Sequence, residues 1–357
     1  MMRRICKVVL NNEHHLANAG DLLLDWALMN GVELPHDCRA GLCGACRVRL
    51  VEGRVFGGHE PGDDMIHACQ ARIISDIAIL TEEMPDPVKL SGRVDDIVRL
   101  APDVVGVRID VPKPFTFLPG QFCKLQLRGF PSRSYSPTYP LEGGADDRML
   151  HFHVRRFTEG KVSAALGRDI RRGHRVRLSG PFGSAFLRRN HHGPIVLVAS
   201  GTGFAPMWSI AVAAIMERPQ RELMFIVAAR ELRSLYSHSA LCRLALFPNV
   251  TIIPVVSEPQ SFFPAIRVGR PTDHLPNLSP TDVVYAAGAP AMTEQVARIA
   301  TAAGAKCYVD PFVSIDNWPN IASGRSVISW LGHPEDNSSK SDGRRNRSRM
   351  REAGLLE

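Results

Sequence analysis

The sequence predicts a multidomain α+β protein with three consecutive folded domains and a polar tail. Its 357 residues suffice for two or three domains, and a hydrophobic content of 45% is ordinary for globular chains. Residues 84–87 hold two prolines in four positions, which indicates a linker. From residue 194 onward, strand-like alternation gives way to apolar runs that alternate with helical segments. We therefore expect domains at residues 1–88, 89–192 and 193–318, and an extension at 319–357.

Each domain has its own pattern of elements. In the first, strands are expected at 4–10, 46–51 and 73–80, with a helix around Leu22–Ala27. The second shows alternating segments at 91–99, 104–111, 121–127 and 149–155, which favour a strand-rich barrel. The third has apolar runs at 195–199, 223–228, 250–256 and 282–286 between helices, which predicts a doubly wound parallel sheet. Residues 336–352 are polar and basic, so the extension is expected to be largely disordered.

The net charge of +7 is unevenly distributed. Residues 1–88 carry 8 Lys and Arg against 13 Asp and Glu, whereas residues 89–192 carry 19 against 9. The basic excess therefore sits beside an acidic domain that can dock on it, and no nucleic-acid partner is expected. No apolar signal segment follows Met1, and glycines and Pro206 interrupt the longest apolar stretch. We expect a cytoplasmic protein without a membrane partner.

Four cysteines form the strongest motif of the sequence. Cys38-x4-Cys43-x2-Cys46, followed by Cys69, has the plant-type spacing for a [2Fe–2S] cluster. Each iron needs two thiolates, and Gly41 lets the backbone turn closely so that an N–H can point at sulfur. A structural zinc site is the alternative, but such a site usually has two Cys-x2-Cys pairs. The remaining cysteines are expected as buried core thiols: Cys6, Cys123, Cys242 and Cys307.

With this motif, residues from about 4 to 315 resemble the reductase components of bacterial ring-hydroxylating dioxygenases, of the naphthalene dioxygenase type. The resemblance implies a β-grasp [2Fe–2S] ferredoxin domain, an antiparallel β-barrel FAD domain and a doubly wound α/β NAD domain, in that order.

The second domain contains the residues that resemble the family's flavin site. Arg133-Ser134-Tyr135-Ser136 matches an Arg-x-Tyr-Ser motif, in which the resemblance implies an arginine on the pyrophosphate, a tyrosine on the isoalloxazine and a serine at flavin N5. Ser136 is accordingly a predicted catalytic residue. Two further segments match, a flavin-facing strand and the start of a phosphate-binding helix. Their predicted cofactor-binding residues are His153, Val154, Gly160, Val162 and Ser163.

The third domain contains a loop typical of dinucleotide binding. Gly201, Thr202 and Gly203 follow a predicted strand and open a helix, where the backbone can approach a pyrophosphate. The family has a glycine where this chain has Ser200, a change that is tolerated if the φ angle of Ser200 is negative.

The last predicted strands of this domain lead into the segments that are expected to contact the nicotinamide. Gly288 and Met292 lie in a segment that resembles the family's nicotinamide loop, although Ala287 replaces its cysteine. Phe312 is a predicted catalytic residue that, by resemblance, covers the flavin; a plain core aromatic is the alternative. Arg230 matches an arginine of NADH-using relatives, and we expect NADH rather than NADPH.

These features predict an electron-transfer reductase. Nicotinamide gives two electrons together, a [2Fe–2S] cluster accepts one, and a flavin can exchange either number, so electrons are expected to pass from NADH through FAD and the cluster. The expected acceptor is a terminal oxygenase or an intermediary ferredoxin. The alternatives are the reductase of a diiron hydroxylase and a redox sensor without turnover.

Overall fold

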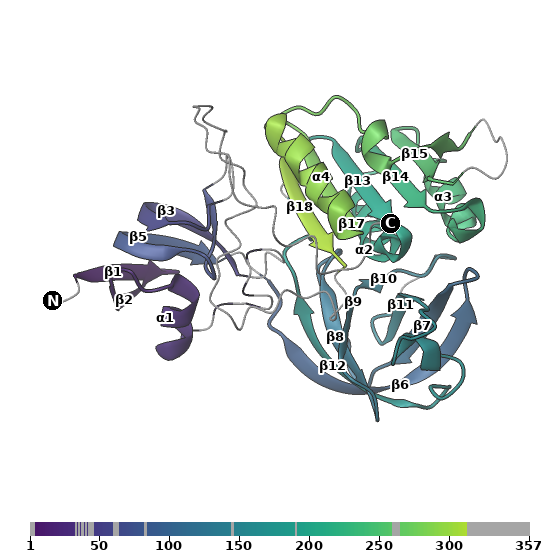
Figure 1. Ribbon diagram of the computed structural model, residues 1–357, viewed down its shortest axis with the longest axis horizontal. Helices are drawn as coiled ribbons and strands as arrows, with labels where there is room; N and C mark the ends of the chain where they lie inside the picture. Colours follow the sequence, from purple (N-terminus) through teal and green to yellow (C-terminus); the bar gives the residue numbers. More distant parts are fainter. Residues whose placement is uncertain are drawn as a thin grey trace, which may run out of the picture. The chain divides into compact units, whose positions relative to one another are not determined.

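The computed structural model describes residues 4–312 apart from 33, 35, 37–38, 40, 42–45, 60–63, 82–83, 144–145, 190 and 259–264. The described chain forms three sheets, one after another along the sequence (Figure 1). The predicted tail at 319–357 lies outside the described residues, and the domain boundaries stay predictions. No helix of the described part is both long and apolar enough to cross a bilayer.

The first sheet is mixed, in the order β2-β1-β5-β3-β4. Its strands are β1 (Ile5–Leu10), β2 (Glu13–Asn18), β3 (Arg47–Phe56), β4 (Met65–His67) and β5 (Arg72–Thr81), and helix α1 (Leu23–Met29) buries Leu23, Leu24, Trp26 and Ala27. β1 and β5 are parallel, whereas β1–β2, β3–β5 and β3–β4 are antiparallel. The three strands and the helix expected from the sequence are present.

The hairpin β1–β2 was not expected. Its turn consists of Asn11 and Asn12, with φ angles of 48° and 72°. Two consecutive positive φ angles between paired strands are typical of a type I′ turn, for which asparagine is one of the few suitable residues. The asparagine pair is therefore the reason that the chain reverses there.

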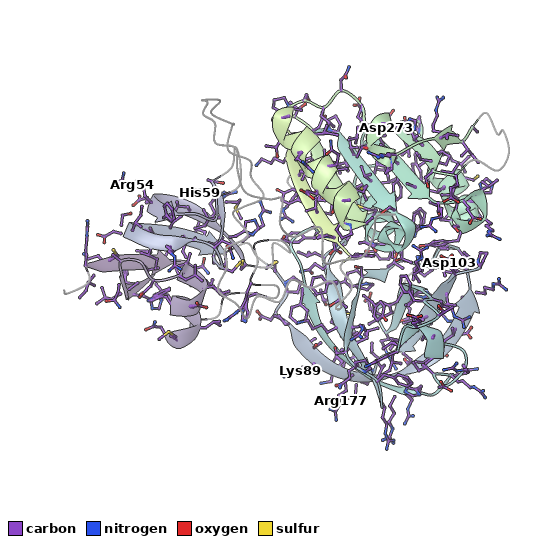
Figure 2. All side chains as sticks on the ribbon, viewed as in Figure 1. Arg54, His59, Lys89, Asp103, Arg177 and Asp273 are labelled. Carbon is purple, nitrogen blue, oxygen red and sulfur yellow. The ribbon has the colours of Figure 1, made fainter. Side chains whose placement is uncertain are left out.

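The second sheet is an antiparallel barrel, in the order β10-β11-β7-β6-β12-β8-β9. Its strands are β6 (Val88–Arg99), β7 (Val104–Asp110), β8 (Phe122–Leu127), β9 (Arg133–Tyr135), β10 (Pro137–Thr138), β11 (Met149–Arg155) and β12 (Arg175–Phe182). All four predicted strands are confirmed. β12 was missed although its side chains alternate, with Val176 and Leu178 in the barrel core and Arg177 pointing outward (Figure 2).

The third sheet is parallel, in the order β16-β15-β14-β13-β17-β18. It comprises β13 (Ile195–Ser200), β14 (Leu223–Ala229), β15 (Val250–Val256), β16 (Arg267–Val268), β17 (Val283–Gly288) and β18 (Lys306–Pro311), with helices α2 (Phe204–Glu217), α3 (His238–Leu244) and α4 (Pro290–Ala302).

The two faces of this sheet are covered by different helices. Leu197 of β13 packs in a core with α2 and α3, whereas its neighbours Val196 and Val198 pack in another core with Val296 of α4. The doubly wound prediction is thus confirmed. The strand order reverses at β13, and in such sheets ligands bind beyond the carboxyl ends of the strands at this point.

Candidate functional site

The Arg-x-Tyr-Ser motif lies at the edge of the barrel. Arg133–Tyr135 forms β9, which pairs with β8 through Cys123↔Tyr135. Burial raises the pKa of Tyr135 to about 12, with Arg133 opposing the shift, so the phenol stays protonated and its ring can serve as a neutral stacking surface. The Arg133 guanidinium donates to the Ser132 carbonyl oxygen at 2.9 Å. Ser136 follows with 6% of its surface exposed.

Strand β11 and the turn after it carry the next predicted residues. Val154 and Val162 are buried in the barrel core. Ser163 Oγ accepts a hydrogen bond from Phe157 N at 3.1 Å, and a Cβ on Gly160 would lie only 2.2 Å from that oxygen. Any larger residue at 160 would displace the Ser163 hydroxyl and its hydrogen bond with Phe157 N. The helix expected after Gly160 is a single 3-10 turn, Ser163–Ala165, because the chain turns again at Gly167 with a φ of 82°.

His153 faces away from the barrel core. The residue is 9% exposed, and its imidazole lies against Phe204 and Tyr236, which belong to the part of the chain that forms the third sheet. Any contact of His153 with a flavin is therefore left to its backbone, as the resemblance implies.

Asp310 is a site residue that the sequence analysis missed. It lies on β18, two residues before Phe312, and its carboxyl group lies beside the Ser136 side chain. Burial raises its pKa to about 7, and the interaction with Ser136 opposes this shift. Its oxygen Oδ2 is buried without a hydrogen-bond partner among the described residues. The only sequence signal was a lone acid within an otherwise apolar strand end.

This contact links the last strand of the parallel sheet to the flavin motif of the barrel. A buried polar oxygen without a partner is costly, and a hydrogen-bonding group of a bound molecule can satisfy it. The residues present therefore fit a flavin beside Ser136.

The predicted nucleotide loop lies at the carboxyl end of β13. Gly201–Gly203 forms a 3-10 turn that leads directly into α2. Ser200 has a φ of −123°, so the prediction that serine is tolerated there is confirmed. Gly201 has a φ of 57°, and a Cβ on it would meet no atom within 4 Å, so the turn has open space on that side. A dinucleotide phosphate can approach this backbone closely.

The nicotinamide-end segment packs against this loop. A Cβ on Gly203 would lie 2.1 Å from the Ala287 carbonyl oxygen, so glycine permits the close contact. Ala289 N donates to Ser200 Oγ at 2.9 Å, which ties the two loops together. Ala287 is fully buried, and Met292 is half-buried on α4.

Phe312 and Arg230 lie at the two sides of this region of the sheet. Phe312 N donates to the Gly288 carbonyl oxygen at 2.7 Å, and the residue is 37% exposed, which excludes the core-aromatic alternative. Arg230 follows β14, with an exposed side chain 3.6 Å from Glu258 Oε1. The structure thus gathers the residues predicted for the nucleotide around the ends of β13, β14 and β17.

Two of the four predicted cluster ligands are described. Cys46 and Cys69 are each 3% exposed, and Gly41 N donates to Cys69 Sγ at 3.2 Å. The predicted N–H to sulfur bond is confirmed, and it suits a thiolate that carries negative charge. Cys38 and Cys43 lie outside the described residues. The other four cysteines were predicted to be buried core thiols. Cys6 and Cys123 are buried, and Cys307 is partly exposed. Cys242 is exposed on α3, so the prediction was wrong for this residue.

Arg47 directly follows Cys46 and contacts the parallel-sheet part of the same compact unit. Its guanidinium carbon lies 4.8 Å from the centroid of the Tyr308 ring, and Arg47 is only 5% exposed. The guanidinium carbon of Arg188 lies 4.2 Å from the centroid of the same Tyr308 ring. A buried cation over an aromatic face is favourable, so the cluster segment has a specific contact with β18. Docking through the opposite net charges of the first two domains stays a prediction.

Comparison with known proteins agrees with this arrangement. Family models match in order: a 2Fe-2S iron-sulfur cluster binding domain at 8–73, an oxidoreductase FAD-binding domain at 91–186 and an oxidoreductase NAD-binding domain at 197–298. The naphthalene 1,2-dioxygenase system ferredoxin–NAD(P)+ reductase component of Pseudomonas putida is 30% identical over 85% of this chain and 96% of its own length. The corresponding component of a Ralstonia naphthalene 1,2-dioxygenase/salicylate 5-hydroxylase system is 33% identical over 79% and 90%.

Solved structures show the same fold. The Amycolatopsis cytochrome P450 reductase GcoB has a TM-score of 0.63 at 27% identity, covering 87% of this chain and 99% of its own. A ferredoxin reductase in carbazole 1,9a-dioxygenase has a TM-score of 0.61 at 24% identity, covering 88% and 100%. With its iron–sulfur, FAD and NAD domains in this order, the chain belongs to the family of electron-transferring NAD(P)H oxidoreductases that includes the naphthalene dioxygenase reductase components.

Proposed function

We propose that this protein is the NADH-dependent reductase component of an aromatic-ring-hydroxylating dioxygenase system, and that it delivers electrons to a terminal oxygenase or an intermediary ferredoxin. The observation that carries the proposal is the contact between Asp310 and Ser136, which brings the nucleotide-binding part of the chain to the flavin motif. The relatives from naphthalene dioxygenase systems, which match over most of their length, support the dioxygenase assignment.

The proposed flavin site uses groups of the barrel. When bound, FAD accepts a hydride from the nicotinamide and releases its electrons singly to the [2Fe–2S] cluster. Arg133 holds the pyrophosphate, Tyr135 offers its neutral ring to the isoalloxazine, and the Ser136 hydroxyl hydrogen-bonds N5. Asp310, protonated over part of the neutral pH range, holds a proton at the Ser136 hydroxyl and supports its orientation.

The proposed nucleotide site uses backbone groups and one aromatic cover. The N–H groups of Gly201–Gly203 face the dinucleotide phosphates, and Ser200 holds the opposite loop in place through Ala289. Phe312, whose ring is exposed, would cover the flavin face when FAD is bound and would give way to the nicotinamide. Arg230 lies 3.6 Å from Glu258 Oε1, a carboxylate that can accept a hydrogen bond from a ribose hydroxyl, and we assign the chain to NADH.

Reconstitution tests the proposal. The purified holoprotein is mixed with NADH or NADPH, an oxygenase component and naphthalene-type substrates, and the dihydrodiol product is measured. Oxidation of NADH coupled to dihydrodiol formation supports the assignment. Coupling only to a diiron monooxygenase component, or no turnover with cytochrome c despite full cofactor content, would contradict it.

A further inference from the structure

The outward face of strand β11 is covered at one position. Phe152 and Val154 point into the barrel core and are 0% and 4% exposed. Because side chains alternate along a strand, His153 points the other way, toward what would be solvent on an isolated barrel. It is nevertheless only 9% exposed, so another part of the chain covers it.

The cover consists of two aromatic residues from the nucleotide-binding part. The ring of Phe204 lies parallel to the imidazole, with centroids 6.2 Å apart, and Tyr236 meets it edge-on at 5.3 Å. His153 Nδ1 and the Tyr236 hydroxyl form a hydrogen bond of 3.1 Å. Phe204 is the residue directly after the turn Gly201–Gly203, so this contact reaches the nucleotide loop itself.

Both partners of this bond are neutral. Burial, with a smaller effect of His151, lowers the pKa of His153 to about 3, and burial raises the pKa of Tyr236. Neither group therefore changes its protonation state around neutral pH, and the hydrogen bond is retained there.

Two further hydrogen bonds lie in the same contact region between the barrel and the nucleotide-binding part, which we call the seam. Thr138 Oγ1 donates to the Ala205 carbonyl oxygen at 2.8 Å, and Ser209 Oγ donates to the Pro137 carbonyl oxygen at 3.1 Å. Both fasten β10 to α2. At the rim of the seam, Asp103, labelled in Figure 2, accepts from Arg155 Nε at 2.9 Å.

The Thr138 and Ser209 bonds both involve helix α2. The His153–Tyr236 bond attaches a different part of the chain, the segment between β14 and α3. Tyr236 also meets the Phe204 ring edge-on at 5.6 Å, so this attachment contacts the residue that directly follows the nucleotide loop. Among the contacts between the two parts, this pair therefore connects the nucleotide loop with the flavin strand.

We propose that His153 and Tyr236 are positioning residues, whose hydrogen bond holds the loop Gly201–Gly203 in register with β11 and so sets the approach of the nicotinamide to the flavin. The proposal rests on the proposed function, because it assigns a role in hydride transfer. Neither side chain needs to touch a cofactor for this role.

Tyr236→Phe is the direct test, because it removes the hydroxyl and keeps the ring. The matched control is Tyr285→Phe, which removes a hydroxyl that accepts a hydrogen bond from Arg188 N at 2.9 Å. This bond also joins the second domain to the parallel sheet, but it involves neither His153 nor Phe204 nor the loop Gly201–Gly203. In the holoprotein, stopped-flow mixing with NADH gives the limiting rate of flavin reduction and the Kd for NADH. Tyr236→Phe is expected to lower the limiting rate about fivefold, the equivalent of one neutral hydrogen bond, with little change in Kd.

A second readout is independent of activity. Amide hydrogen exchange of residues 201–204 is expected to accelerate in Tyr236→Phe and to stay unchanged in Tyr285→Phe, while both variants lose similar thermal stability. If Tyr236→Phe does not fold, His153→Asn, which keeps a polar atom near the position of Nδ1, is compared with His153→Leu. The asparagine variant is then expected to be the faster one.

The outcomes separate the two proposals. The positioning role would be overturned if wild type and Tyr236→Phe had the same limiting rate of flavin reduction and the same amide exchange at residues 201–204. It would also be overturned if Tyr236→Phe and Tyr285→Phe lowered the limiting rate equally. Failure of the wild-type holoprotein to reduce its flavin with NADH would instead overturn the proposed function.

Discussion

Asp310 makes the stability of this protein depend on pH in an unusual direction for a carboxylic acid. Its pKa is raised from 3.8 to about 7 by burial, so the folded chain favours the protonated form. Replacement by asparagine keeps the shape of the side chain and removes the titration. The penalty for the ionised carboxylate, and hence the gain from Asp310→Asn, amounts to at most about 4 kcal/mol.

The sign follows from proton linkage. Below about pH 3 Asp310 is protonated in both the folded and the unfolded chain, and the penalty is absent. As the pH rises from there toward 8, the unfolded chain releases its proton first, so the wild type loses stability relative to the variant. Above about pH 8 the carboxyl group is ionised in both states and the difference is constant. Between pH 5 and pH 8, the free energy of unfolding of the variant minus that of the wild type is expected to rise by about 2.5 kcal/mol.

Urea unfolding of the holoprotein at several pH values, with FAD in excess, measures this difference. Asp110→Asn, which changes an exposed carboxylate of β7, is the control and is expected to show no such trend. A difference between wild type and Asp310→Asn that stays flat from pH 5 to pH 8, or that has the opposite slope, would refute the reasoning.

Three further substitutions test separate parts of the site. Cys69→Ser is expected to abolish the iron–sulfur spectrum and to lower NADH-dependent cytochrome c reduction roughly tenfold or more, with ferricyanide reduction by the flavin retained. Ser200→Ala removes the acceptor of the Ala289 N–H and is expected to weaken NADH binding about fivefold, as measured by stopped flow; an unchanged Kd would argue against the link between the loops. Arg47→Ala removes the contact with Tyr308, at a cost of about 1 kcal/mol in docking of the cluster segment. Flavin-to-cluster transfer should then slow while flavin reduction by NADH stays the same, and equal slowing of both steps would count against it.

The sequence predicted the order of sheets and helices well, because apolar periodicity is a local property. The runs at 195–199 and 223–228 reappear as β13 and β14. Short or polar elements were missed: β2 depends on the conformation of two asparagines, and β10 has only two residues. The turn after Gly160 was expected to be a helix, since its glycine and serine suit a helix start as well as a turn.

For the site, the sequence predicted the residues with a motif and missed those that depend on distant contacts. The negative φ of Ser200 and the N–H of Gly41 at Cys69 Sγ followed from local backbone requirements. The meeting of Asp310 with Ser136 joins positions 174 residues apart, and no local pattern reports it. The side-chain role of His153 likewise depends on Tyr236, 83 residues away.

The central claim is that one chain receives electrons in pairs from a nicotinamide and passes them on singly. Anaerobic titration of the purified protein with NADH, followed by visible absorption and electron paramagnetic resonance, tests it most directly. We expect uptake of two electrons by the flavin and one by the cluster, with the reduced [2Fe–2S] signal appearing as the flavin absorption bleaches. A flavin that bleaches while the cluster stays oxidised, or a preparation that contains no flavin at all, would contradict the account.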